Sequence, residues 1–153
     1  DTYTEHDTLS LHDALPILAS GIIDFEGVGP EYPVEEIVEH PILEPEITEG
    51  KACGVFEIND PNFGNLWTNI RLEDFNRAGF AYGDYVNVTV KHDGEVAFQQ
   101  KVLFHQSFGF AEKGDPMIYN NELMKVSLAV SQGSFCDKYN LGYGPEWTVE
   151  FTK

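Results

Sequence analysis

One run of eleven residues near the middle of the chain combines turn formers, aromatic rings and amides, and it reads Asp60-Pro61-Asn62-Phe63-Gly64-Asn65-Leu66-Trp67-Thr68-Asn69-Ile70. Its first three residues predict a turn, because Asp and Asn side chains bond their own backbone and Pro fixes φ. After the turn, Phe63, Asn65 and Trp67 occupy alternate positions. A strand has a side-chain period of two, so a strand here would place these three side chains on one face.

A face with two aromatic rings and one amide suits a flat heteroaromatic ligand such as adenine, because the rings stack on the ligand and the amide reads its edge. Gly64 removes a side chain from the opposite face, so another backbone can come close there. The plainer interpretation is a half-buried strand with an Asn at a bend. The spacing of these residues alone favours that plainer interpretation.

The run at 60–70 resembles the signature of the S-adenosylmethionine (SAM) hydrolase family, also called SAM hydroxide adenosyltransferases, to which fluorinases and chlorinases belong. The resemblance continues in two later runs, Lys125-Val126-Ser127-Leu128-Ala129-Val130-Ser131-Gln132-Gly133-Ser134-Phe135 and Gly144-Pro145-Glu146-Trp147-Thr148-Val149-Glu150. From about Leu18 to its end, the chain resembles the carboxy-terminal domain of that family. The resemblance implies a β-barrel that takes SAM as a substrate, with no cofactor.

The resemblance also implies roles for the residues of the first motif. Asp60 stands where the family acid holds the methionine ammonium, and a charge-assisted hydrogen bond is physically sufficient for that role. The same carboxylate can also close an Asx-turn. Phe63 and Trp67 match the aromatic contacts to the nucleoside, and Asn65 matches the amide that contacts adenine.

Further site residues follow from the resemblance in the later part of the chain. Phe108 best matches another ring that covers adenine, with Phe110 as the alternative, although periodicity alone would place either ring in a core. Ser131 keeps a hydroxyl that serves as a helix cap or a ligand contact. Gln132 would offer its backbone groups to adenine.

Two positions depart from the family pattern. After Asn121 the family has a Ser that holds the methionine carboxylate, whereas this chain has Glu122. An ionised Glu122 would repel a carboxylate, so either it points away and the Leu123 backbone amide binds the carboxylate, or the amino-acid end is bound differently. Val130 stands where the halogenase branch has Arg, which disfavours a halogenase.

Short apolar runs with turn signals predict an all-β domain, with strands at 52–58, 63–70, 85–92, 95–104, 117–120, 125–130 and 146–152. Asp93-Gly94 predicts a type I′ hairpin, because that turn needs positive φ at both central residues. Residues 72–79 predict a short helix closed by Gly79, and 131–139 another with Ser131 as its N-cap. This pattern predicts an antiparallel Greek-key barrel or sandwich with one or two short helices.

The chain divides into three parts by composition. We expect residues 51–153 to form the carboxy-terminal β-barrel domain, and the acidic, Pro-rich residues 18–50 to be a linker from an amino-terminal domain outside this sequence. Little regular structure is expected in the linker beyond one helical turn at 34–38. Residues 1–17 resemble translated sequencing-adapter text and are interpreted as a non-native segment.

Composition limits the partners. A chain of 153 residues with 42% hydrophobic content allows one domain with a sizeable core. A net charge of −17 argues against nucleic-acid phosphates and anionic membrane surfaces as partners. Cys53 and Cys136 have no CxxC spacing, so free thiols in a reducing, cytoplasmic compartment are expected. The expected partner is a small nucleoside or SAM.

No residue of this chain is expected to be catalytic. The sequence has no nucleophile elbow, Gly-rich phosphate loop or HExxH spacing, and no metal site is indicated. The family resemblance implies that an Asp, an Arg and a His of the first domain position the water, in a homotrimer whose sites lie between subunits. Three hypotheses follow: the substrate-binding domain of a SAM hydrolase that forms adenosine and L-methionine, inactive alone; a halogenase of the same fold; and a non-catalytic nucleoside-binding module.

Overall fold

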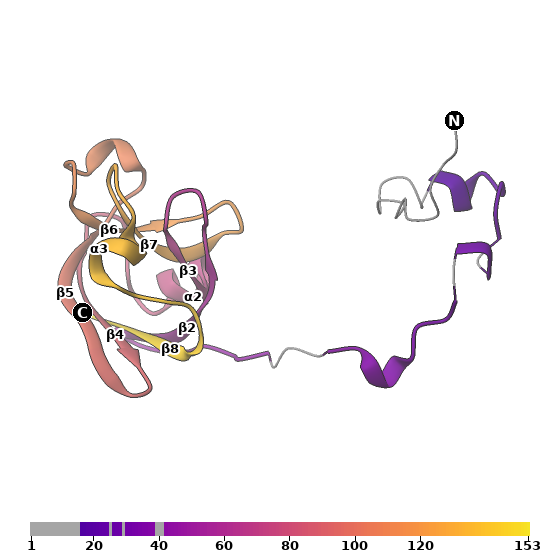
Figure 1. Cartoon of the computed structure of the whole chain (residues 1–153). Coiled ribbons are helices and arrows are strands. Elements are labelled where there is room, and N and C mark those ends of the chain that lie inside the picture. The colour runs from indigo at the N-terminus through magenta and orange to yellow at the C-terminus, as the bar shows by residue number, and fades with distance from the viewer. Residues whose placement is uncertain (1–15, 25, 29, 39–41) are drawn as a thin grey trace. The chain divides into compact units, whose positions relative to one another are not determined.

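The computed structural model describes residues 16–24, 26–28, 30–38 and 42–153 (Figure 1). The chain forms two compact units, Asp1–His40 and Pro41–Lys153. The first unit contains two short 3-10 helices, η1 (Glu26–Val28) and η2 (Val34–Glu36), and η2 falls on the helical turn predicted at 34–38. The interpretation of residues 1–17 as non-native lies outside the described residues, apart from its last two positions.

The second unit is built from eight strands, β1 (Glu46–Thr48), β2 (Lys51–Asn59), β3 (Leu66–Arg71), β4 (Tyr85–His92), β5 (Glu95–Phe104), β6 (Pro116–Asn120), β7 (Lys125–Val130) and β8 (Gly144–Thr152). The strand order is β1-β2-β3-β7-β6-β5-β4-β8, and an additional pairing of β2 with β8 closes the last seven into a barrel. The barrel prediction is therefore confirmed. The barrel is mixed rather than purely antiparallel, because β5 and β6 run parallel and are joined by a long connection.

The hairpin between β4 and β5 forms where the turn chemistry predicts it. Asp93 and Gly94 both have positive φ, at 49° and 85°. Along β4, Val86, Val88 and Val90 are buried while their neighbours are more exposed. The turn residues thus fix the register, and the alternation decides which face of β4 enters the core.

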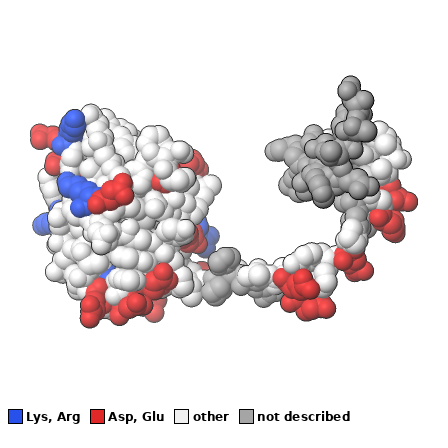
Figure 2. Space-filling model, viewed as in Figure 1, with Lys and Arg blue, Asp and Glu red and all other residues white. Residues whose placement is uncertain are grey.

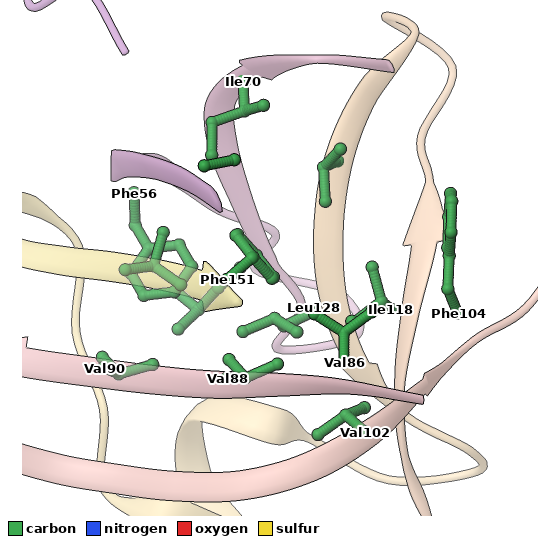
Figure 3. Packing of buried hydrophobic residues seen from close by; sticks show 14 of the residues in the cluster. Phe56, Ile70, Val86, Val88, Val90, Val102, Phe104, Ile118, Leu128 and Phe151 are labelled. Carbon is green, nitrogen blue, oxygen red and sulfur yellow. The ribbon is translucent and has the colours of Figure 1, made fainter. Parts of the chain in front are cut away.

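Aromatic rings fill much of the barrel interior, together with the aliphatic side chains shown in Figure 3. The helix α2 (Leu72–Arg77) contributes Phe75, which stacks on Phe80 with ring centroids 4.2 Å apart. Phe75 also meets Phe104 and Phe151 edge to ring, at 5.3 and 5.2 Å. The predicted helix at 72–79 is thus one turn that anchors the core, and Gly79 follows it with a φ of 98°.

Two predicted elements begin later than expected. β3 starts at Leu66 and not at 63, because Gly64 has a φ of 65° and a turn precedes it. The helix α3 (Phe135–Tyr139) starts four residues after the predicted N-cap Ser131, since Ser134 is the actual cap and its Oγ accepts from the Asp137 N–H at 3.1 Å.

Besides η1, two elements of the second unit were not predicted. β1 lies within the predicted linker 18–50 and pairs with β2, and Ile47 packs against the core. A 3-10 helix, η3 (Phe108–Phe110), lies in the connection between β5 and β6. β1 shows that regular structure begins before Lys51.

The surface carries the acidic charge expected from composition. Between Leu18 and Gly50 the sequence has no Lys or Arg, and in Figure 2 this part of the chain shows red acidic side chains without blue ones. The described part of the chain contains no helix with the length and hydropathy needed to span a membrane.

Candidate functional site

A pocket of about 980 Å³ lies against the outer side of strands β3, β6 and β7. Four connections form its walls: the loop between β2 and β3, the segment around η3, the turn between β6 and β7, and the segment from the end of β7 into α3. The pocket is lined by Asn59, Asp60, Pro61, Asn62, Phe63, Gly64, Asn65, Trp67, Phe108, Gly109, Ala111, Tyr119, Glu122, Val130, Ser131, Gln132, Gly133, Ser134, Cys136 and Asp137.

Trp67 and Tyr119 form the floor of the pocket and belong to a row of three residues across neighbouring strands. Trp67 on β3 stands opposite Ser127 on β7, and Ser127 stands opposite Tyr119 on β6. Directly opposed side chains lie on the same face of a sheet, so the small Ser127 separates two large rings. The Phe108 ring of η3 packs on Tyr119 with centroids 4.7 Å apart.

Polar groups of this floor are buried without full hydrogen bonding. The Trp67 Nε1–H is buried and has no hydrogen-bond partner within the described residues. Asn65 is 5% exposed, and its side chain lies against the Tyr119 hydroxyl. A buried donor or acceptor without a partner is costly, so such groups indicate a place for a polar ligand edge.

Tyr119 stays protonated in this setting. Burial raises the pKa of Tyr119 to about 12, and the Glu122 charge also raises it, although the nearby Trp67, Ser127 and Asn65 side chains oppose the shift. The hydroxyl can therefore donate and accept hydrogen bonds at neutral pH.

The loop between β2 and β3 is folded by its own turn chemistry. The Asp60 Oδ1 accepts from the Asn62 N–H at 2.9 Å, the Asx-turn expected for this residue. The Asp60 carbonyl accepts from the Gly64 N–H at 2.7 Å, and the Asn65 carbonyl accepts from the Asp60 N–H at 2.9 Å. These bonds present Asp60 and Phe63 to the pocket.

The loop also locks onto α3. A Cβ at Gly64 would lie 3.1 Å from the Ser134 Cα and still closer to the Ser134 side chain. The Gly64 carbonyl accepts from the Cys136 N–H at 3.0 Å. The predicted close approach of backbone at Gly64 is therefore confirmed, and the approaching segment is the start of α3.

Phe63, Asn65 and Trp67 all line the pocket, but not as one strand face. Phe63 lies in the turn and is 67% exposed, Asn65 is buried just before β3, and only Trp67 belongs to the strand. The period-two reasoning was wrong about the geometry, because Gly64 bends the backbone between Phe63 and Asn65.

The connection between β6 and β7 places Glu122. The buried Asn121 holds this turn: its Oδ1 accepts from the Leu123 and Lys125 N–H groups at 2.9 and 3.0 Å, and its Nδ2 donates to Ser127 Oγ at 3.0 Å. Glu122 lines the pocket, whereas Leu123 does not. The Leu123 N–H considered for a carboxylate thus already donates to Asn121.

The end of β7 carries two more of the predicted residues. The buried Ser131 donates from Oγ to the Ala111 carbonyl at 3.3 Å and from its N–H to the Asp115 carbonyl at 3.0 Å. It therefore fastens the segment after η3 to β7. Gln132 follows with a φ of 54° and also lines the pocket. The alternative ring, Phe110, has a side chain outside the described part of the structure.

Tyr119, Cys136 and Asp137 line the pocket and were missed by sequence reasoning. The Cys136 Sγ donates to Asn59 Oδ1 at 3.3 Å, and burial raises the pKa of its thiol to about 11. Side chains alternate along β6, and Ile118 faces the core, so this alternation would have placed Tyr119 on the other face of the sheet. No local signal connects Cys136 or Asp137 with the motif at 60–70.

A family model, the SAM hydroxide adenosyltransferase C-terminal domain, matches residues 54–148. The chain belongs to this family. A fluorinase of Actinopolyspora mzabensis is 33% identical over 83% of this chain and 42% of its own length, and a fluorinase of Actinoplanes sp. is 34% identical over 67% of this chain and 34% of its own length. This chain therefore spans less than half the length of these relatives.

The fold has a solved counterpart. An uncharacterized conserved protein from Thermotoga maritima superposes with a TM-score of 0.71 at 22% identity, covering all of this chain and 54% of the other. The SAM hydroxide adenosyltransferase match spans every pocket-lining residue, from Asn59 to Asp137. The pocket thus lies within the region that the family model matches.

Proposed function

We propose that this chain is the substrate-binding domain, on the adenine and methionine side, of a SAM hydrolase that forms adenosine and L-methionine. The observation that carries this proposal is the pocket floor, where the buried Trp67 Nε1–H lacks a partner among the described residues and the buried Asn65 lies beside the Tyr119 hydroxyl. Phe63 and Phe108 stand exposed around that floor. Rings with an unsatisfied polar edge between them suit a flat purine.

The amino-acid end of the substrate would meet the carboxylate of Asp60. This residue lines the same pocket as the rings, and its Asx-turn bond to Asn62 uses only Oδ1 as acceptor of that N–H. A carboxylate next to an ammonium forms a charge-assisted hydrogen bond. Asp60 would thus orient the methionine part while the rings hold the base.

The proposed reaction needs a positioned water more than an activated leaving group. The water oxygen attacks the ribose C5′, the C–S bond breaks, its electron pair stays on sulfur as the methionine thioether, and the water loses one proton. No His, Arg or Lys lines the pocket in the part of the chain that the structure describes. Residues that orient the water would therefore come from another domain, in a proposed trimer with sites between subunits.

A halogenase is the second candidate, because the matched relatives in two organisms are named fluorinases. Val130 lines the pocket at the position where the resemblance would give a halogenase Arg, which ranks this candidate below the hydrolase. A nucleoside-binding module without catalysis would use the same floor. Adding chloride or fluoride to the assembled enzyme would separate halide use from water use by the identity of the nucleoside product.

Calorimetric titration of this chain with adenosine tests the nucleoside site. Asn65→Ala should weaken adenosine binding by about 1–3 kcal/mol, the usual cost of leaving a buried polar edge unpaired, and should change thermal stability little. The matched control is Asn69→Ala. Asn69 is equally buried, accepts from the Val55 N–H at 3.0 Å and donates to the Leu43 carbonyl at 2.6 Å, but does not line the pocket.

The control should behave in the opposite way, with lower thermal stability and unchanged affinity for adenosine. If Asn65→Ala lowers the melting temperature and leaves adenosine affinity as in the unmodified chain, Asn65 is a core residue and the nucleoside assignment fails. Absence of any adenosine binding by this chain assembled with that other domain would also contradict the proposal.

A further inference from the structure

The charged groups that line the pocket all have the same sign. They are the carboxylates of Asp60, Glu122 and Asp137, and no Lys or Arg of the described residues contributes to the lining. None of these three carboxylates forms an ion pair with another described residue. The pocket therefore has a negative potential that the described part of this chain does not neutralise.

The Lys residues nearest in sequence to Glu122 and Asp137 make their contacts outside the pocket. Lys125, three residues after Glu122, pairs with Glu57. Lys138, next to Asp137, donates to the Gly114 carbonyl and lies 5.2 Å from the centre of the Tyr139 ring. Neither ammonium lines the pocket.

Glu122 faces the floor of the pocket rather than away from it. It lines the pocket, and its charge acts on the Tyr119 hydroxyl. The Asn121 hydrogen bonds to the Leu123 and Lys125 N–H groups hold the turn that carries it. This turn thus places the Glu122 carboxylate where it would contact a ligand that lies over Tyr119.

A separate observation indicates that the pocket takes a ligand. Asn65 is 95% buried and lines the pocket beside the Tyr119 hydroxyl. The Trp67 Nε1–H beside it has no partner in the same residues. These neutral groups would hold the uncharged part of a ligand, and the carboxylates would act on its charged part.

We propose that this pocket binds adenine nucleosides with a positively charged 5′ substituent more tightly when that substituent lacks a carboxylate, and that Glu122 is the specificity-determining residue. This inference rests on the nucleoside site proposed above. A sulfonium or ammonium gains Coulomb energy beside Asp60 and Glu122, whereas a carboxylate placed there is repelled and must lose water without a compensating cation. Sulfonium nucleosides without the amino-acid carboxylate should therefore bind more tightly than SAM itself.

Two ligands that differ only in that carboxylate test the inference: SAM and its decarboxylated form, titrated into this chain at low ionic strength, with adenosine as reference. The decarboxylated ligand should bind about three- to tenfold more tightly than SAM, a range typical of one partly screened charge interaction. Glu122→Gln should bring the two affinities within about twofold of each other and leave adenosine affinity unchanged. Added salt should narrow the difference in the unmodified chain.

Glu95→Gln is the matched control, because it removes the same charge at the β4–β5 hairpin, outside the pocket lining. The Glu95→Gln variant should keep the full preference for the decarboxylated ligand over SAM. SAM binding as tightly as the decarboxylated ligand, or a preference that Glu122→Gln leaves intact, would overturn the inference while adenosine binding still supports the nucleoside site. Binding of the decarboxylated ligand without adenosine binding would contradict the nucleoside site alone. Failure of all three ligands to bind to this chain assembled with the other domain would overturn both.

Discussion

Burial controls the chemistry of two protic side chains that line the pocket. It raises the pKa of Cys136 to about 11 and that of Tyr119 to about 12. Both groups are therefore neutral at physiological pH. The Cys136 side chain is a thiol that donates a hydrogen bond to Asn59, and not a thiolate nucleophile. Tyr119 keeps its proton and can donate it in a hydrogen bond to a ligand acceptor.

These shifts predict that the protein loses stability at high pH. The ordinary pKa values are 9.0 for Cys and 10.0 for Tyr. Above pH 9 the unfolded chain releases protons that the folded protein retains, so the free energy of unfolding falls as the pH rises, first through Cys136 and then through Tyr119. Urea unfolding at pH 8 and at pH 10.5 should show a loss on the order of 1–2 kcal/mol.

Cys136→Ala should make this pH dependence shallower, whatever the variant's stability at pH 8, because the variant has one fewer shifted group. Tyr85→Phe, at a position that is 61% exposed, is the control and should keep the pH dependence. An unfolding free energy that is constant from pH 8 to pH 10.5 would show that neither proton is held by the fold.

At the scale of elements, the pocket depends on how the β2–β3 loop meets α3. The contact at Gly64 and Ser134, the Cys136 N–H to Gly64 carbonyl bond and the Cys136 Sγ to Asn59 bond all join these two segments. Since both segments line the pocket, their joint position sets its shape.

Substitution of two glycines with positive φ distinguishes the stability cost of a left-handed backbone from the additional cost of a close backbone approach. Gly94 has a φ of 85° with open space around it, whereas Gly64 has a φ of 65° and Ser134 against it. Gly94→Ala should lower the free energy of unfolding by about 1 kcal/mol, the usual cost of a left-handed residue with a side chain. Gly64→Ala should cost clearly more and also weaken adenosine binding, because α3 must move.

Chemical unfolding and adenosine titration of both variants provide the comparison. Equal losses of stability in the two variants, with adenosine affinity preserved in Gly64→Ala, would mean that the Ser134 contact has no energetic weight.

At the scale of the molecule, the apolar residues found buried in the described chain all lie between Ala52 and Phe151. The strand pairings close within the second unit, since β2 pairs with both β3 and β8. A closed barrel leaves few free edges and needs no further strand to satisfy its backbone. The barrel should therefore be stable as residues 42–153.

A shortened chain that starts at Ile42 should melt within about 2 °C of the full chain, a shift that corresponds to a small fraction of a typical domain's stability. A chain that starts at Lys51 should melt several degrees lower, because it lacks β1 and the Leu43 carbonyl that Asn69 binds. Differential scanning calorimetry of the three chains tests this. Equal melting temperatures for the Ile42 and Lys51 starts would show that β1 is not part of the folding unit.

Features that depend on neighbouring residues could be predicted without the structure. Asp93-Gly94 specified the hairpin because positive φ at both positions is a local requirement, and alternating valines specified the buried face of β4. The motif at 60–70 identified Asp60, Phe63, Asn65 and Trp67, since residue types are visible without coordinates, and all four line the pocket.

The surroundings of that motif could not be predicted, because they depend on contacts between distant segments. Tyr119, Glu122 and Cys136 reach it through pairings between β3, β7 and β6 and through the contact of α3 with Gly64, and residues far apart in sequence give no periodic signal of such contacts. The bend at Gly64, the N-cap at Ser134 and the parallel pairing of β5 with β6 also follow from barrel closure and packing. Local sequence patterns indicate which residue types could form a site, and the pairing of strands in the closed sheet determines which of these residues contact one another.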